Sequence, residues 1–161
     1  MILVAIGSNL SSKEFGKPID NCYEVLKVLS KMFILKKKSS FYKSEPIPKS
    51  NQPWYVNGVI EIASSSDPHK ILEILLNIEN SFGRQRKKKN ESRVIDLDLL
   101  SYNDKLIETN SLVLPHPRMH LRNFVLKPIL DIDPNWIHPL LKKTVKELIK
   151  EIDNIQKIKK I

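Results

Sequence analysis

Apolar and polar positions alternate with two different spacings along the first part of the chain, and each spacing predicts a different element. The continuous apolar run Ile2–Ile6 indicates a buried strand, which ends at the turn-forming residues Gly7-Ser8-Asn9. A helix is expected to begin at Pro18, because proline is tolerated in the first turn. Apolar residues then recur on one helix face at Ile19, Cys22, Tyr23, Leu26, Leu29 and Phe33.

The middle of the chain predicts two more strands and a second helix. One strand is expected over Ile34 to Tyr42, before the proline-containing loop Glu45–Pro48, and another over the Val- and Ile-rich segment Tyr55 to Ala63. Asp67-Pro68 combines a favoured N-cap residue with proline at the first helical position. The helix that it starts is expected to stop at Gly83.

The remaining elements complete the predicted fold. A fourth strand is expected over Val94 to Tyr102 and a last helix from Lys143 to about Ile155, followed by a frayed lysine-rich tail at Gln156–Ile161. The order β-α-β-β-α-β up to residue 102 predicts an α+β, ferredoxin-like antiparallel sheet with helices on one face and a C-terminal helical extension. Because the first 150 residues show neither a repeat nor a linker, we expect one domain over 1–161.

Composition narrows the class of protein. With 161 residues, 41% apolar and 28% charged, the chain is typical of a soluble globular domain. The single cysteine, Cys22, excludes an internal disulfide and fits a reducing cytoplasm. The run Met1–Ile6 is too short for a signal peptide or a membrane span, so we expect a cytoplasmic protein without membrane contact. The net charge of +9 favours anionic partners, although lysine runs are usually solvated surface.

The segment Arg93–Leu100 carries the strongest chemical signal. Because side chains alternate along a strand, Asp96 and Asp98 share one face, while Ile95, Leu97 and Leu99 share the other. Two carboxylates placed in this way can converge on hard cations such as magnesium, with phosphates completing the coordination shell. The alternative is a strand with one wet face, but aspartate disfavours strands, which supports the metal interpretation.

A basic run precedes the two aspartates. Six of the ten residues from Arg84 to Arg93 are basic, and this connection would deliver its cations beside Asp96 and Asp98. Arginine suits phosphate oxygens, although such runs are often only solvated loops. His116 and His120 lack the zinc-protease glutamate, and Pro117 lies between them. Glycine-rich phosphate loops are also missing from the sequence. From residues alone, a metal-assisted phosphate enzyme and a basic ferredoxin-like binding module both remain open.

From Ile2 to about Ile152 the chain resembles the 6-hydroxymethyl-7,8-dihydropterin pyrophosphokinase family. The Arg-x-x-Asp-Leu-Asp segment at Arg93–Asp98, together with the downstream Pro115-His116, is the most specific part of the resemblance. Further landmarks are Ala5–Leu10, Ser40–Ser44, Gln52–Asn57, Gly83–Arg86 and Arg122–Phe124. The resemblance implies transfer of the β,γ-pyrophosphoryl unit of ATP to the hydroxymethyl oxygen of the pterin, which leaves AMP.

Site residues follow from the resemblance position by position. It implies that Asp96 and Asp98 bind two magnesium ions and, with Arg84 and Arg93, form the catalytic set. It also implies the following contacts: Glu79, Arg84, Arg93, His116 and Arg122 with ATP, and Ser44, Ile47, Tyr55, Asn57 and Phe124 with the pterin. Tyr55 and Phe124 would hold the pterin between two aromatic faces. Because a metal-bound Asp98 would be a poor base, we expect positioning and metal activation to dominate catalysis. We also expect the protein to be a monomer.

Two departures from the family pattern bear on loop geometry. Asn90, Glu91 and Ser92 stand where the family often has an aromatic residue and a Gly-Pro pair, and Glu45 displaces the proline expected after Ser44. We expect the basic loop to be mobile until MgATP orders it, with Asn90 covering the pterin poorly.

The competing hypothesis is a basic ferredoxin-like RNA-binding module. Such modules present aromatic residues in a characteristic strand motif, which this sequence lacks. Paired aspartates would repel a nucleic-acid backbone. We therefore expect ATP and the pterin as partners, and no nucleic acid.

Overall fold

The computed structural model describes residues 1–83, 92–152 and 156–161. Its elements are, in chain order, β1 (Ile2–Ser8), α1 (Pro18–Met32), β2 (Ile34–Lys38), β3 (Tyr42–Ser44), β4 (Tyr55–Ala63), α2 (Pro68–Ser81), β5 (Asp96–Tyr102), β6 (Ile107–Glu108), β7 (Val113–Leu114), a 3-10 turn (Met119–Leu121), α3 (Asn123–Ile132), α4 (Val145–Ile152) and β8 (Ile158–Lys160). Residues 84–91 of the predicted basic loop, which include Arg84 and Asn90, lie outside the described part of the chain.

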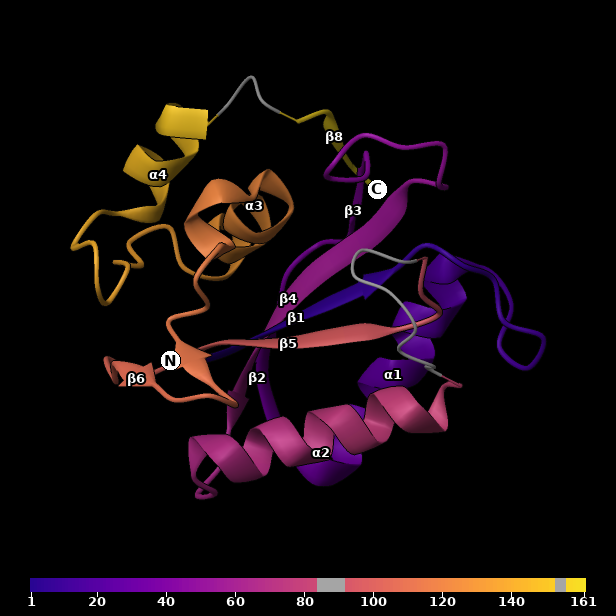
Figure 1. The fold of residues 1–161 in the computed structure, drawn as a ribbon, viewed down its shortest axis with the longest axis horizontal. Coiled ribbons are helices and arrows are strands. Elements are labelled where there is room, and N and C mark those ends of the chain that lie inside the picture. The colour runs from indigo at the N-terminus through magenta and orange to yellow at the C-terminus, as the bar shows by residue number, and fades with distance from the viewer. Residues whose placement is uncertain (84–91, 153–155) are drawn as a thin grey trace.

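The main sheet is antiparallel and runs in the order β5-β1-β4-β3-β8, with β2 also paired to β4 (Figure 1). The register brings three strands together at one end of the sheet. Gly7 of β1 lies opposite Asp96 on one side and Asn57 on the other, and Ala5 lies opposite Asp98. The predicted α+β class is confirmed, while the ferredoxin-like assignment stays a prediction because the sheet gains an edge strand at β8.

A β-bulge interrupts the pairing of β1 with β5. Leu3 pairs with Ser101 and Val4 pairs with Leu99, so Leu100 is the extra residue. On the side of the bulge that leads back to Asp96, the strands keep strict alternation. Beyond the bulge, the parity of inward and outward residues is reversed, and Tyr102 packs against the same core as Leu97 and Leu99.

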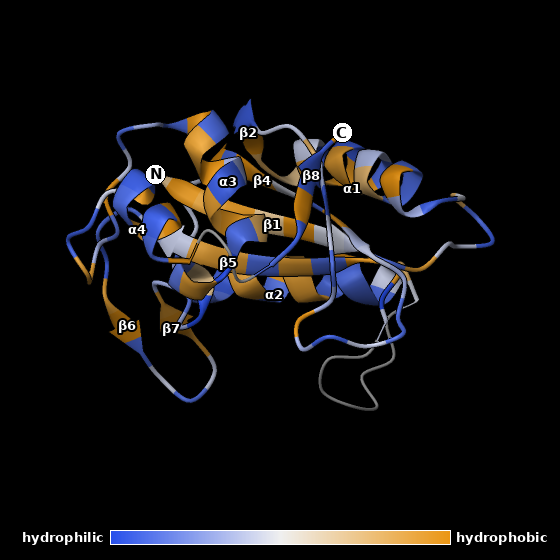
Figure 2. Cartoon of the chain, turned by 90° about the horizontal axis from the view of Figure 1, so that it is seen from above, coloured by the Kyte–Doolittle hydropathy of each residue, from blue (hydrophilic) through white to orange (hydrophobic). Residues whose placement is uncertain are grey.

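Two hydrophobic cores lie on opposite faces of the sheet. Val4, Ile6 and Leu97 pack with the buried faces of α1 and α2. Leu3 and Leu100, which point the other way, pack with α3 and α4. Figure 1 shows the two helix pairs on opposite sides of the sheet, and Figure 2 shows that the hydrophobic residues concentrate on the strands and inner helix faces. Helices α1 and α2 share one face, as predicted, and the C-terminal helices α3 and α4 cover part of the second face.

The expected strand over residues 34–42 is divided into β2 and β3. The buried residue Ser39 explains the break. Its hydroxyl accepts a hydrogen bond from the Val59 N–H at 3.0 Å, and in a regular sheet a backbone carbonyl would accept this bond. Phe41 then packs over Gly58, where an added Cβ would lie 2.8 Å from the ring. The chain remains beside β4 but loses regular pairing between the two short strands.

The last third of the chain contains an unpredicted helix, and its predicted final helix begins two residues later than expected. Helix α3 contains Pro128, which normally disfavours a helix interior, but the helix buries an apolar stripe that includes Val125, Leu126 and Ile129. Helix α4 begins at Val145, after Thr144 and Glu147 exchange hydrogen bonds in a capping box. Within the described part of the chain, none of the helices has the length and apolar character to cross a membrane.

Candidate active site

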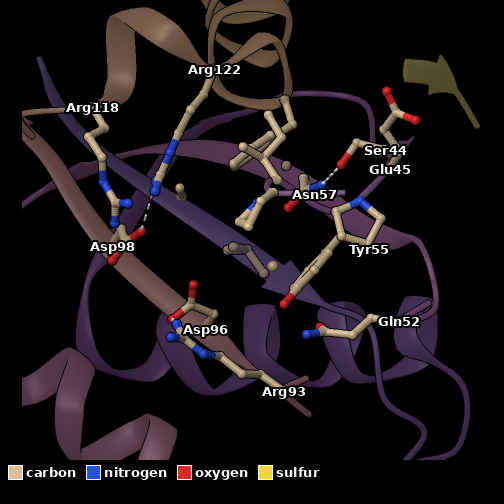
Figure 3. A pocket seen from close by; sticks show the side chains of 18 of the residues that line it. Ser44, Glu45, Gln52, Tyr55, Asn57, Arg93, Asp96, Asp98, Arg118 and Arg122 are labelled. Atoms are coloured by element: carbon tan, nitrogen blue, oxygen red, sulfur yellow. Dashed lines mark hydrogen bonds and ion pairs between the residues drawn. The ribbon is translucent and has the colours of Figure 1, made fainter. Parts of the chain in front are cut away.

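A cavity of about 500 Å³ lies on the α3 side of the sheet, where β1, β4 and β5 meet. Its walls include the loop after β3 and the segment that leads into α3. The predicted site residues that line it are Ser44, Ile47, Tyr55, Asn57, Arg93, Asp96, Asp98, His116, Arg122 and Phe124. In Figure 3, Arg118, Arg122 and Asp98 gather at one end, and Ser44, Asn57 and Tyr55 gather at the other.

Each aspartate of β5 faces an arginine from a different segment. The Arg93 guanidinium forms an ion pair with Asp96, and Arg122 Nη1 lies 3.8 Å from Asp98 Oδ2 (Figure 3). Leu97 and Leu99 point into the core on the other face, as the period of the strand predicts. This end of the cavity therefore holds both signs of charge, so it can accept polyphosphate on the arginines and cations on the carboxylates.

The two carboxylates fit magnesium as partial ligands. Among the described residues, His, Cys, Asp and Glu side chains do not form a cluster of three or more that could hold a metal. An ion here would therefore take its remaining ligands from phosphate and water, which is the usual behaviour of magnesium. Gly7 leaves the floor beside Asp96 open, because an added Cβ would lie 3.8 Å from the Asp96 Cβ and 3.2 Å from Asn57 Oδ1.

Asn9 holds the approach to β5 in place, a role that the sequence did not predict. Its Oδ1 accepts a hydrogen bond from the Arg93 N–H at 2.7 Å, and its Nδ2 donates to Gln52 Oε1 and to the Pro53 carbonyl. Asn9 is buried, and its own N–H donates to the Arg93 carbonyl. The residue that looked like part of a strand-exit turn thus ties the segments before β4 and β5 together.

The other end of the cavity combines amide, hydroxyl and aromatic groups. Asn57 Nδ2 donates a hydrogen bond to Ser44 Oγ at 2.7 Å, and both side chains are buried. Tyr55 of β4 is half-buried at the cavity beside Gly7. Phe124 lies at the start of α3, and the Arg122 guanidinium lies over its ring, 5.4 Å from the ring centroid. A flat polar ring system could stack against these aromatic side chains and bond to Asn57 at its edge.

Comparison with known proteins matches this chain to one family model. Residues 3–134 match the model described as 7,8-dihydro-6-hydroxymethylpterin-pyrophosphokinase, or HPPK. The chain belongs to the HPPK family. A 2-amino-4-hydroxy-6-hydroxymethyldihydropteridine pyrophosphokinase of Haemophilus influenzae is 36% identical over 158 residues, which cover 97% of this chain and 95% of that protein.

Two further HPPK relatives differ in length. A protein of the same name from Synechocystis is 36% identical over 153 residues, covering 94% of this chain and 75% of the relative. The folic acid synthesis protein FOL1 of Dictyostelium discoideum is 35% identical over 154 residues, which are 96% of this chain. This chain spans only 23% of that longer protein.

His116 of this HPPK-family chain is placed as a neutral hydrogen-bond donor. Its Nδ1 accepts a hydrogen bond from the Arg118 N–H at 3.2 Å, so we assign the ring proton to Nε2. Burial, reinforced by Arg122 and Arg118, lowers the pKa of His116 to about 4. His116 can therefore donate to a phosphate oxygen at neutral pH. The positive charge at this end comes from Arg122 and from Arg118, and Arg118 was not among the predicted site residues.

We expect His116 to make the fold less stable in acid. Its folded-state pKa of about 4 is below the ordinary value of 6.5, so between these values the unfolded state binds the extra proton and stability falls as pH falls. His116 alone should change the free energy of unfolding by up to about 1.4 kcal/mol per pH unit in this range. Urea unfolding of the wild type and His116→Asn across this range measures it.

His138 provides the internal control for this measurement. Its pKa is also lowered to about 4, by burial and by His120, and it is present in both proteins. The difference between the two unfolding curves therefore isolates His116. Parallel curves would contradict the assignment of a neutral, buried His116.

One predicted site residue of the described part of the chain, Glu79, does not line the cavity. Glu79 is buried on α2, where its Oε1 accepts a hydrogen bond from the Leu97 N–H at 2.6 Å, so its observed contact supports β5 between the two aspartates. A contact of Glu79 with ATP stays a prediction. Arg84 falls within residues 84–91, outside the described part of the chain.

Proposed function

We propose that this chain transfers the pyrophosphoryl group of ATP to the hydroxymethyl oxygen of 6-hydroxymethyl-7,8-dihydropterin in folate biosynthesis. Membership of the HPPK family and the name of a relative that is covered over 95% of its length support this reaction. The observation that carries the proposal is one cavity with charged residues suited to phosphates at one end and a stacking and amide-lined surface at the other.

The reaction exchanges one bond at the β-phosphorus of ATP. The pterin oxygen forms a bond to this phosphorus, the bond to the α,β-bridging oxygen breaks, and AMP leaves with that oxygen. Arg93, Arg122 and Arg118 line the cavity where they can neutralise the charge that builds up on the phosphate oxygens. His116 would add a neutral donor. We assign the loss of the hydroxyl proton to solvent, since positioning accounts for the catalytic effect.

The pterin would bind at the uncharged end. Tyr55 and Phe124 come from β4 and α3 and would supply its stacking surfaces. Asn57, already held by Ser44, would bond to the polar edge of the pterin with little loss of side-chain freedom. Ile47, on the loop after β3, would close this end.

Two magnesium ions belong to the proposal, with Asp96 and Asp98 as their protein ligands. When bound, magnesium neutralises and polarises phosphate oxygens. Each carboxylate is already partly exposed to the cavity, and each is paired with an arginine that could turn to the phosphates instead. The aspartates would thus exchange an arginine partner for a cation as the substrate binds.

Partner and location complete the proposal. We expect a monomer in the cytoplasm, where the single buried thiol of Cys22 stays reduced. The RNA-binding alternative gains no support from the comparisons, because the matching family and the relatives compared above are named for pyrophosphokinase or folate synthesis.

The test of the reaction is the product formed from ATP. We expect AMP to appear only when both magnesium and the hydroxymethyl-dihydropterin are present, because the attack is on the β-phosphorus and needs the pterin oxygen. Chromatography of the nucleotides after incubation measures this, with EDTA and pterin-free reactions as controls. Formation of ADP would place the chain among enzymes that transfer the γ-phosphoryl group instead.

A further inference from the structure

The tail predicted to be frayed forms the edge strand β8, and this strand lies against the substrate loop. It pairs antiparallel with β3, with Ser44 opposite Ile158, Lys43 opposite Lys159 and Tyr42 opposite Lys160. The Ile161 N–H adds a hydrogen bond to the Phe41 carbonyl. The segment that holds Ser44 is therefore enclosed between β4 on one side and β8 on the other.

Glu45 is the residue through which the segment just before β8 contacts the cavity wall. Its N–H donates to the Lys157 carbonyl at 3.1 Å, and its Oε1 accepts from the Lys157 N–H at 2.9 Å. Gln156, which is buried, donates from Nε2 to the Glu45 carbonyl at 2.7 Å. The Glu45 side chain in Figure 3 accordingly points away from the aspartates.

A proline at position 45 could not make this arrangement. Proline lacks the N–H that Glu45 donates to Lys157 and the carboxylate that accepts in return. Proline would stiffen the loop through its own ring, whereas this chain fixes the same residue with hydrogen bonds from a distant segment. The departure at Glu45 and the ordered tail therefore explain each other.

We propose that residues 156–161 position the loop Ser44–Pro48 for binding of the pterin, with Gln156 as the key positioning residue. This inference rests on the proposed function of that end of the cavity. The path is short: Gln156 and Lys157 hold Glu45, the adjacent Ser44 accepts from Asn57, and Ser44, Glu45 and Asn57 line the cavity. A loop held in its binding conformation raises apparent affinity, because apparent Kd scales inversely with the competent fraction.

Gln156→Met tests the inference, because it keeps the side-chain volume and removes the donor to Glu45. We expect the amides of Ser44, Glu45 and Ile47 to exchange hydrogen faster, and the Kd of the hydroxymethyl-dihydropterin to rise about fivefold, the factor of one ordinary hydrogen bond. The Kd of MgATP should change less than about twofold, since the arginine end does not contact the tail. Lys159→Met changes an exposed side chain of β8 and keeps the backbone pairing with Lys43, so it should leave all three quantities unchanged.

The hydrogen-exchange and affinity results together decide whether the tail positions the loop. Unchanged exchange at the three amides overturns the positioning role, and so does faster exchange with unchanged pterin affinity. Equal weakening of pterin and MgATP would show general structural damage and also overturn it. If the wild type binds no pterin, the proposed function fails, while the exchange measurement still decides whether the tail holds the loop.

Discussion

Asp96→Ala and Asp98→Ala should each lower kcat by at least about 100-fold, and toward about 1000-fold, the scale of losing a group that stabilises charge in the transition state. Both side chains face the cavity, so their removal withdraws the carboxylates proposed to hold magnesium and leaves Arg93 or Arg122 without its counter-ion. The fold should persist, because the core residues of β5 are Leu97 and Leu99 on the other face. Rates of AMP formation and thermal unfolding measure the two effects.

Asp104→Ala is the matched control for the aspartate variants, because Asp104 is an exposed residue in the turn after β5. Its activity and unfolding midpoint should match the wild type. In the two site variants, the magnesium concentration for half-maximal activity should also rise, which a purely structural change would not produce. Full activity in either variant would remove the proposal of two magnesium ions.

Tyr55→Ala and Phe124→Ala should each weaken pterin binding by about 1–3 kcal/mol, the scale of base stacking on aromatic side chains. Tyr55→Phe should keep most of the affinity, because the ring remains. MgATP affinity should change much less than pterin affinity, because the phosphates are assigned to the arginine end and Phe124→Ala removes only the ring that lies 5.4 Å from the Arg122 guanidinium. Isothermal calorimetry with each ligand separately measures both affinities.

Trp54 offers a control for the aromatic prediction. It precedes Tyr55 in the chain and is 45% exposed, so Trp54→Ala removes a large ring from a neighbouring position. We expect the affinity for pterin to stay within about twofold of the wild type. Equal weakening of pterin and MgATP by the Tyr55 and Phe124 variants would mean that these rings serve core packing.

The parts of the fold that were predictable are those in which side-chain spacing reports burial directly. In β5 the alternation of aspartate and leucine placed two carboxylates on one face and two core residues on the other, as observed. The Asp67-Pro68 signal placed the start of α2 correctly, with Asp67 accepting from the His69 N–H. These features depend on neighbours in the sequence, so a single chain suffices to read them.

The features that sequence reasoning missed depend on contacts between distant segments. Helix α3 forms despite Pro128, because burial of its apolar stripe against the sheet offsets the cost of a proline inside a helix. Strand β8 has little apolar surface, and its order comes from backbone pairing with β3 and from an ion pair between Lys160 and Asp131. Asn9 reads as a turn residue until its partners, more than forty positions away, are known. The roles of the site residues toward their ligands remain predictions.

The bulge at Leu100 determines where this protein can tolerate an insertion or a deletion. An insertion within the paired segment Asp96–Leu99 would shift the residues on one side of it by one position along β1 and reverse their side chains between that point and the bulge. Leucines would then enter the cavity, and carboxylates would enter the core. An extra residue already lies at Leu100, so the chain beyond it is uncoupled from the alternation at Asp96 and Asp98. Libraries of variants should therefore vary length only after residue 100 and restrict the preceding segment to substitutions.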